Sequence, residues 1–145
     1  MRLFLLITFS FLFFRNIAQA QFNFLDTWQV FMFKSGEIAE IDNKEAQKII
    51  GGKISLKNDL AIMLYDTCKN PMYRVREVNT NEYLRRDYRA NSNTLGIQSN
   101  TIKILEIFCD KKTKDIADFD LVMTNDSTLI FPSLGYFFVL KKNDL

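Results

Sequence analysis

The chain has 145 residues, 48% of them hydrophobic and 25% charged, with a formal net charge of +2. This length fits one domain able to bury its own core, and the small net charge gives no basic excess that would favour nucleic acid. Histidine is absent from the sequence, which removes serine and cysteine hydrolase triads and the common zinc sites. A site made of carboxylates alone, such as two acids flanking a glycosidic bond, stays open, with Glu77, Glu82, Asp87 and Glu106 as candidates by location. Acids in strands and helix turns are usually solvated, so we expect no enzymatic activity, no metal and no cofactor.

The first twenty residues have the features of a secretory signal peptide. Arg2 supplies a short positive region, an apolar run follows, and residues 18–20 have the small-x-small pattern that signal peptidase cleaves. Arg15 ends the apolar run well short of the roughly 20 residues that a spanning helix needs. We expect cleavage before Gln21, and a secreted or periplasmic protein that has no membrane contact afterwards.

Removing residues 1–20 leaves one expected domain, residues 21–145, that is electrically neutral. The signal contains two of the 19 basic residues and no acidic residue, so 17 residues of each sign remain. A neutral domain gives no reason to expect a nucleic-acid partner or an anionic membrane surface.

The fold class predicted for this domain is mostly β: a single antiparallel β-barrel or sandwich of eight to nine short strands with one or two short helices. Strands are expected where β-formers or alternating apolar residues run between turn signals. Such runs occupy residues 27–33, 37–41, 53–56, 60–65, 72–78, 101–109, 117–123, 128–132 and 136–140.

Two of these strands are apolar on both faces. In 27–33, alternation puts Trp28, Val30 and Met32 on one face and Phe31 and Phe33 on the other, which predicts a strand covered on both sides. In 101–109 the apolar residues also fall on both faces. That strand is either buried on both sides or has its register shifted by a bulge.

Helix signals occur twice. Asp42 followed by Glu45 resembles a capping box and predicts a short helix over 43–50, which two glycines end. A second helix is expected over 82–88, capped by Thr80 or Asn81, and a polar loop should follow it up to residue 100.

Cys68 and Cys109 are the only cysteines. In an exported chain, two cysteines most simply form one disulfide, because the compartment is oxidising. A redox-active or nucleophilic cysteine needs a C-x-x-C pair or a histidine partner, and the sequence has neither.

One segment combines arginine and tyrosine, the residue types that most often anchor protein interfaces. It is either a binding surface for a partner or a set of solvated polar faces. The candidate partner-binding residues are Tyr73, Arg74, Arg76, Tyr83, Arg85, Arg86, Tyr88 and Arg89.

Aromatic residues of the first and last strands form a second candidate site. If those strands pair as in a barrel, the aromatics line an apolar cavity or simply pack the core. The candidate lining residues are Trp28, Phe31, Phe131 and Phe138. Separately, Asn125 begins an N-glycosylation sequon on a predicted turn, which matters only in a eukaryotic source.

The order of elements resembles small lipocalin-like barrels and exported META-type domains. The resemblance is carried by Trp28 on the first strand, the two cysteines, and the closing aromatic pattern over 119–121, 129–131 and 135–141. It covers the mature chain loosely, and Asp26 stands where lipocalins have a glycine. The resemblance implies a β-barrel and a carrier of a small apolar ligand.

Two functions follow as expectations. The first is an exported non-enzymatic module that binds an envelope or extracellular protein, for instance as an inhibitor or immunity-type protein. The second is a lipocalin-like carrier of a small apolar ligand. A connected apolar cavity would favour the carrier, and a filled core beside an exposed tyrosine and arginine surface would favour the binder.

Overall fold

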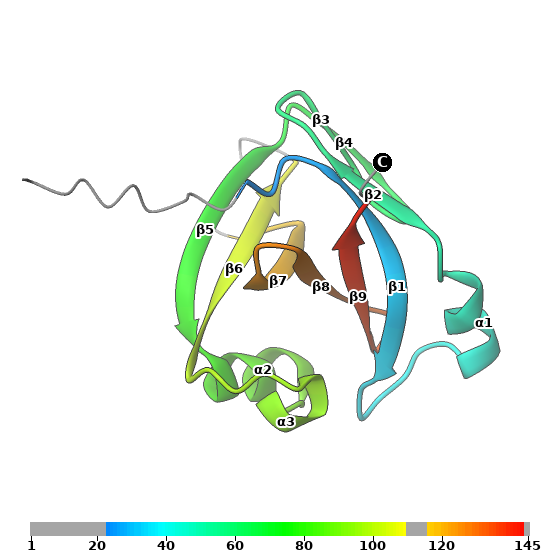
Figure 1. The fold of residues 1–145 in the computed structure, drawn as a ribbon, viewed down its shortest axis with the longest axis vertical. Coiled ribbons are helices and arrows are strands. Elements are labelled where there is room, and N and C mark those ends of the chain that lie inside the picture. Colours follow the sequence, from blue (N-terminus) through cyan, green and yellow to red (C-terminus); the bar gives the residue numbers. More distant parts are fainter. Residues whose placement is uncertain (1–22, 110–115, 144–145) are drawn as a thin grey trace, which may run out of the picture.

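A computed structural model describes residues 23–109 and 116–143, so the predicted signal peptide lies outside the described residues. It contains a nine-stranded antiparallel sheet curled into a half-barrel, with three short helices (Figure 1). The elements are β1 (Thr27–Ser35), α1 (Asn43–Lys48), β2 (Lys53–Leu56), β3 (Leu60–Ile62), β4 (Thr67–Lys69), β5 (Met72–Asn79), α2 (Thr80–Tyr88), α3 (Ser92–Leu95), β6 (Thr101–Phe108), β7 (Phe119–Asn125), β8 (Thr128–Ser133) and β9 (Tyr136–Lys142). The predicted mostly-β class is confirmed.

The sheet consists of two meanders joined by β1. The strand order is β4-β3-β2-β1-β9-β8-β7-β6-β5, so β1 pairs on one side with β2 and on the other with β9. Each meander contains only neighbours in sequence, joined by short turns. The two edges of the sheet are therefore β4 and β5, which follow one another in the chain.

These two edges are tied together at one end of the curl. Cys68 on β4 forms a disulfide with Cys109, just after β6, and this confirms the predicted pairing. The Tyr73 hydroxyl of β5 donates a hydrogen bond to the carbonyl of Lys57, at 2.7 Å. Figure 1 shows β3 and β4 arching over to the upper end of β5 at this place.

The inner face of the curl is filled with side chains from both meanders. Strands from β1 to β9 contribute to one buried cluster, which shows that the two halves of the sheet face each other. Its members include Trp28, Val30, Ile54, Leu56, Ala61, Cys68, Leu105, Ile107, Leu121, Leu129, Phe131, Phe138 and Leu140.

Within residues 23–109 and 116–143, α2 and α3 pack on part of the outer face. A second cluster joins these helices to the outward side chains of β6 to β9, namely Tyr83, Leu84, Leu95, Ile102, Ile104, Val122, Ile130 and Phe137. Both faces of β6 are therefore buried, and its pairings with β5 and β7 run without a register shift. Burial on both sides, rather than a bulge, explains the apolar pattern of this strand.

A bulge occurs in β1 instead. The register with β9 shifts between Val30 and Met32, so the alternation of side chains restarts there. Trp28 and Val30 face the inner cluster, and after the bulge Phe33 packs against it while Phe31 is 56% exposed. The prediction that Phe31 and Phe33 share one covered face is thus wrong, because one extra residue changes the parity.

The strand predicted at 37–41 is absent. The segment is a loop whose backbone bonds to the β8–β9 turn: Gly36 N–H donates to the Gly135 carbonyl at 2.8 Å, and Glu40 N–H to the Leu134 carbonyl at 3.0 Å. Because β1 pairs with β2 and β9, both of its edges are already occupied.

The helices begin close to the predicted places. Asp42 caps α1 by accepting from the Glu45 N–H at 2.8 Å, as the capping box predicts. The cap of α2 is Asn79 rather than Thr80 or Asn81. The expected polar loop contains the single turn α3, and the run predicted at 60–65 ends at Ile62.

Candidate binding surface

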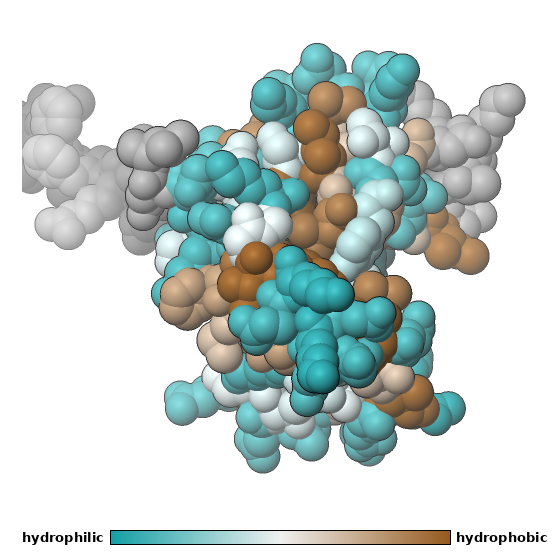
Figure 2. All heavy atoms as spheres, turned by 90° about the vertical axis from the view of Figure 1, so that its right-hand side faces the viewer, coloured by the Kyte–Doolittle hydropathy of each residue, from teal (hydrophilic) through white to brown (hydrophobic). Residues whose placement is uncertain are grey.

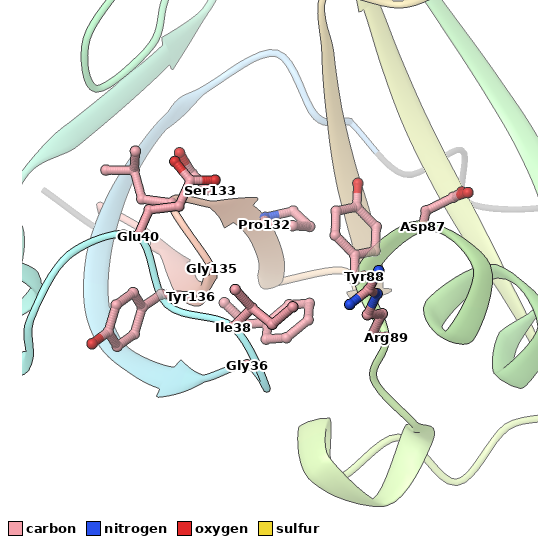
Figure 3. Close-up of a pocket in the computed structure, with 12 residues that line it drawn as sticks. Gly36, Ile38, Glu40, Asp87, Tyr88, Arg89, Pro132, Ser133, Gly135 and Tyr136 are labelled. Atoms are coloured by element: carbon pink, nitrogen blue, oxygen red, sulfur yellow. The ribbon is translucent and has the colours of Figure 1, made fainter.

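A pocket of about 360 Å³ lies where α2 ends beside the β8–β9 turn (Figure 3). Three segments form it: the loop after β1, the end of β8 with the turn that follows, and the last residues of α2. Its lining residues are Gly36, Ile38, Glu40, Asp87, Tyr88, Arg89, Pro132, Ser133, Leu134, Gly135, Tyr136 and Phe137.

One wall of the pocket is held by backbone contacts. Leu134 and Gly135 have φ angles of 54° and 75°, in the left-handed region that favours glycine. A Cβ at Gly135 would overlap the carbonyl oxygen of Ile38 and lie 2.6 Å from the Cα of Ala39. This close approach and the two hydrogen bonds of the loop fix the position of Ile38, whose side chain is 59% exposed.

The facing wall is the C-terminal end of α2. Arg89 ends the helix with φ of 50°, and its N–H donates to the carbonyl of Arg85. The ring of Tyr88 meets that of Phe137 edge-on, with centroids 5.8 Å apart. Figure 3 shows Ile38 and Pro132 on one side of the pocket and Tyr88 with Arg89 on the other.

The exposed arginines of α2 differ in their partners. The Arg86 side chain forms a salt bridge with its neighbour Asp87, with Nε and Oδ1 2.7 Å apart. Within the part of the chain that the structure describes, Arg85 and Arg89 form no salt bridge. Arg89 thus presents a guanidinium without a salt bridge among the described residues at a pocket that the apolar residues Ile38 and Pro132 also line.

Arg74 and Arg76 lie on β5, away from this pocket. Each donates from Nε to the carboxylate of Glu106 on β6, at 2.6 Å, and their guanidinium groups lie over the rings of Phe108 and Tyr83. Burial raises the pKa of Glu106, but the hydrogen bonds and charges of the two arginines outweigh it and hold that pKa below its usual value. Glu106 therefore stays ionised and fixes both arginines.

Tyr83 and Tyr88 form a buried polar group beneath α2 with Asp120 of β7. The Tyr83 hydroxyl donates to Asp120 Oδ2 at 2.9 Å, and the two tyrosine hydroxyls are 3.2 Å apart. Burial raises the pKa of Asp120 and raises the pKa of Tyr88 to about 12. These groups anchor α2 on the sheet, so neither tyrosine hydroxyl is presented to a partner.

Tyr73 also has a structural position. Its ring lies 5.1 Å from that of Phe24, and its hydroxyl is used in the bond to Lys57. The predicted arginine and tyrosine set therefore separates into three groups: the α2 surface with Arg85, Arg86 and Arg89, the β5 pair Arg74 and Arg76, and three tyrosines with structural contacts.

The four residues predicted to line a cavity do not lie together on one face of the sheet. Trp28, Phe131 and Phe138 are buried in the inner cluster, with at most 5% exposure. Phe31 lies on the outside, where the Lys141 ammonium sits 4.0 Å from its ring centroid. Apolar side chains on the face that carries α1 occur in patches broken up by hydrophilic residues (Figure 2).

Sequence reasoning missed the partners Glu106 and Asp120 as organisers of these groups. A signal for them existed, because each acidic residue has an apolar residue on either side of it in its strand, and a carboxylate buried there needs a partner.

The described residues contain no group of three or more acidic or cysteine side chains that could hold a metal ion. No helix within residues 23–109 or 116–143 has the length and apolar character needed to span a bilayer. The sequence matches no family model, and neither a curated protein nor a solved structure matches the chain.

Proposed function

We propose that the protein is an exported, non-enzymatic binding protein, and that the pocket beside α2 captures a segment of an envelope or extracellular protein. The observation that carries this proposal is that Arg89, which forms no salt bridge within residues 23–109 and 116–143, faces the exposed apolar side chain of Ile38 across a preformed pocket. A disulfide in the fold is compatible with an extracellular or periplasmic location.

The size of the pocket favours a protein segment as the occupant. Pockets for small molecules span roughly 300–1,000 Å³, so 360 Å³ lies at the small end of that range. Such a volume takes one large side chain with the backbone beside it. Hot spots of protein interfaces are commonly single anchor side chains of this kind.

The charges indicate which segment fits. Arg89 lies on the α2 side of the pocket, and Figure 3 places Glu40 near Ser133 on the opposite side. An apolar anchor flanked by a carboxylate on the Arg89 side and by a hydrogen-bond donor on the Glu40 side would complement this arrangement. The second acidic residue of the pocket, Asp87, is neutralised by Arg86.

A lipocalin-like carrier of a small apolar ligand has less support. Three of the four residues proposed to line a ligand cavity pack into the inner cluster with other core side chains, and the fourth, Phe31, points outward. The lipocalin-like resemblance therefore remains a proposal about fold.

Site-specific photo-crosslinking in the native envelope or medium tests the binding proposal. A photoreactive residue placed at Ile38 should form a discrete adduct with one partner. Arg89→Glu should abolish that adduct, because it reverses the charge at the mouth of the pocket. Lys44→Glu makes the same charge change on the exposed surface of α1 and should leave it intact. Equal adduct formation in both variants would rule out the pocket as the binding site.

A further inference from the structure

The edge strand β5 is much longer than the strand at the opposite edge of the sheet, β4. It has eight residues in continuous register with β6, without a bulge, whereas β4 has three residues. Within residues 23–109 and 116–143, β5 pairs only with β6. Natural edges are usually shortened, bulged or covered, because a free edge is a template for another strand.

The direction of the β5 backbone groups follows from one bond just beyond the strand. Thr80 N–H donates to the carbonyl of Asn100 at 2.9 Å, and this pair continues the β5–β6 register. Since antiparallel strands alternate between bonded and non-bonded pairs, the even-numbered residues of β5 bond to β6. Tyr73, Val75 and Glu77 then direct their N–H and C=O groups to the free edge.

Two contacts define the length of this edge. Tyr73 is tied to Lys57 at one end, and α2 begins at Thr80 at the other. The open stretch is centred on Val75, whose side chain is 43% exposed. A short extended segment of about five or six residues, at roughly 3.4 Å per residue, can lie along it.

The side chains beside the open edge have a defined pattern. Arg74 and Arg76 project on the outer face, on either side of Val75 in sequence, and both donate to the carboxylate of Glu106. Val75 projects on the opposite face, as strand alternation requires. A strand added here meets two cations on one face and an apolar side chain between them on the other.

We propose that the β5 edge accepts an extended segment of a partner protein by β-strand addition. The segment carries acidic residues at two alternate positions, opposite Arg74 and Arg76, and an apolar residue between them, opposite Val75. Backbone hydrogen bonds supply the affinity, and the acidic-apolar-acidic pattern supplies the specificity. This surface is separate from the pocket beside α2, so the inference does not depend on the proposed function.

A second copy of the chain is a poor occupant of this edge. In an antiparallel pair of β5 strands centred on residue 75, Arg74 of one copy lies directly opposite Arg76 of the other, and a pair centred on residue 74 or 76 places that arginine opposite itself. Like charges placed directly opposite each other destabilise a strand pair.

Peptides test the proposal with the unmodified protein, purified from a host that exports it. The probe is the capped hexapeptide Thr-Lys-Glu-Val-Glu-Thr, which places valine opposite Val75 and lysine opposite Glu77. Its affinity is measured by titration, and backbone amide shifts locate it. The amides of Val75 and Glu77 should move and become protected from hydrogen exchange.

Two N-methylated peptides form a matched pair. Methylation of the valine nitrogen removes the donor that faces Val75 and should weaken binding at least about tenfold. Methylation of the second glutamate nitrogen, which faces away from β5, should change binding by less than about threefold. Replacing both glutamates by lysine should also weaken binding at least about tenfold.

Two protein variants complete the test. Val75→Pro removes the outward N–H while sparing the ladder with β6, and it should abolish binding with circular dichroism unchanged. Val75→Thr keeps the N–H and should retain binding. No binding up to millimolar peptide, or an equal loss for the two methylated peptides, would overturn the proposal. Self-association that Val75→Pro abolishes would instead show that a second copy occupies this edge.

Discussion

The Cys68–Cys109 disulfide should supply a large part of the stability of this domain. It links residues 41 apart in sequence and ties the edge strand β4 to the end of β6. In the chain-entropy model, a loop of this length lowers the entropy of the unfolded chain by an amount worth about 4 kcal/mol at 25 °C. Domains of this size have total stabilities of only about 5–15 kcal/mol.

Urea unfolding, followed by circular dichroism, measures this contribution. With a denaturant slope of about 1.5 kcal/mol per M, a loss of about 4 kcal/mol corresponds to a fall in the urea midpoint of roughly 2.7 M. The oxidised protein compared with the same protein in a reductant isolates the cross-link. The reduced protein compared with the Cys68→Ala, Cys109→Ala double variant then isolates packing, because Cys68 is buried in the inner cluster.

The reasoning is refuted if oxidised and reduced proteins differ by less than about 1 kcal/mol, well under the loop-entropy value. That result would show that the reduced, unfolded chain keeps residual structure at this end of the curl, for instance through the hydrogen bond from Tyr73 to Lys57. The disulfide would then restrict the unfolded chain by less than the loop-entropy value.

Two further predictions concern the pocket wall and the β5 arginines. Gly135→Ala should lower the free energy of unfolding in urea by about 1–3 kcal/mol more than Gly51→Ala does. Both positions have a positive φ, but only at Gly135 do backbone atoms occupy the place of the added Cβ. An equal decrease in the two variants would contradict this contact. Glu106→Gln should lower stability by about 1–2 kcal/mol at neutral pH. Because the folded-state pKa of Glu106 is lowered, its contribution is fully present above the unfolded pKa and is lost as the pH falls through the folded pKa. The difference between wild type and Glu106→Gln should therefore shrink to zero on acidification; a difference that persists in acid would sink this account. The raised pKa of Asp120 acts in the opposite direction, and the comparison of the two proteins cancels it only in part, because the charge of Glu106 contributes to that raised pKa.

Local sequence signals predicted most of the elements. The capping box at Asp42 and Glu45, the strand at residues 53–56 and the pairing of the two cysteines depend on neighbouring residues or on the number of cysteines, and each is confirmed. Such features are determined by residues close together in the chain or by the number of cysteines, so they can be predicted from a single sequence.

The features that failed depend on distant residues. The bulge in β1 exists because its pairing with β9 shifts register between Val30 and Met32, and nothing in 27–33 reveals the position of β9. The segment at 37–41 alternates well enough for a strand, yet both edges of β1 are already filled. An alternating pattern predicts a strand, and which of its side chains are exposed, only when it is known that a neighbouring strand has an edge left to pair with.

The candidate site shows the same division. Residue types identified arginine and tyrosine as a group. They could not separate Arg89, which lines a pocket and has no salt bridge in the described part of the chain, from Arg76, held by Glu106. Which arginine meets a carboxylate is decided by strand register, since Arg74 and Glu106 are direct cross-strand partners. The pocket itself needs three segments from distant parts of the chain, and no local pattern predicts it.

The central place of β1 has a consequence for how the protein reaches its fold. Its pairing with β9 joins Trp28 to Lys142, almost the full length of the described chain, whereas every other pairing in the sheet is between consecutive strands. Contacts so distant in sequence form slowly, because the entropy of closing the loop must be overcome first. During folding, the two meanders can therefore assemble before β1 pairs with β9. Trp28, the single tryptophan, is buried and lies on β1 where it pairs with β9, so its fluorescence reports the final step of folding.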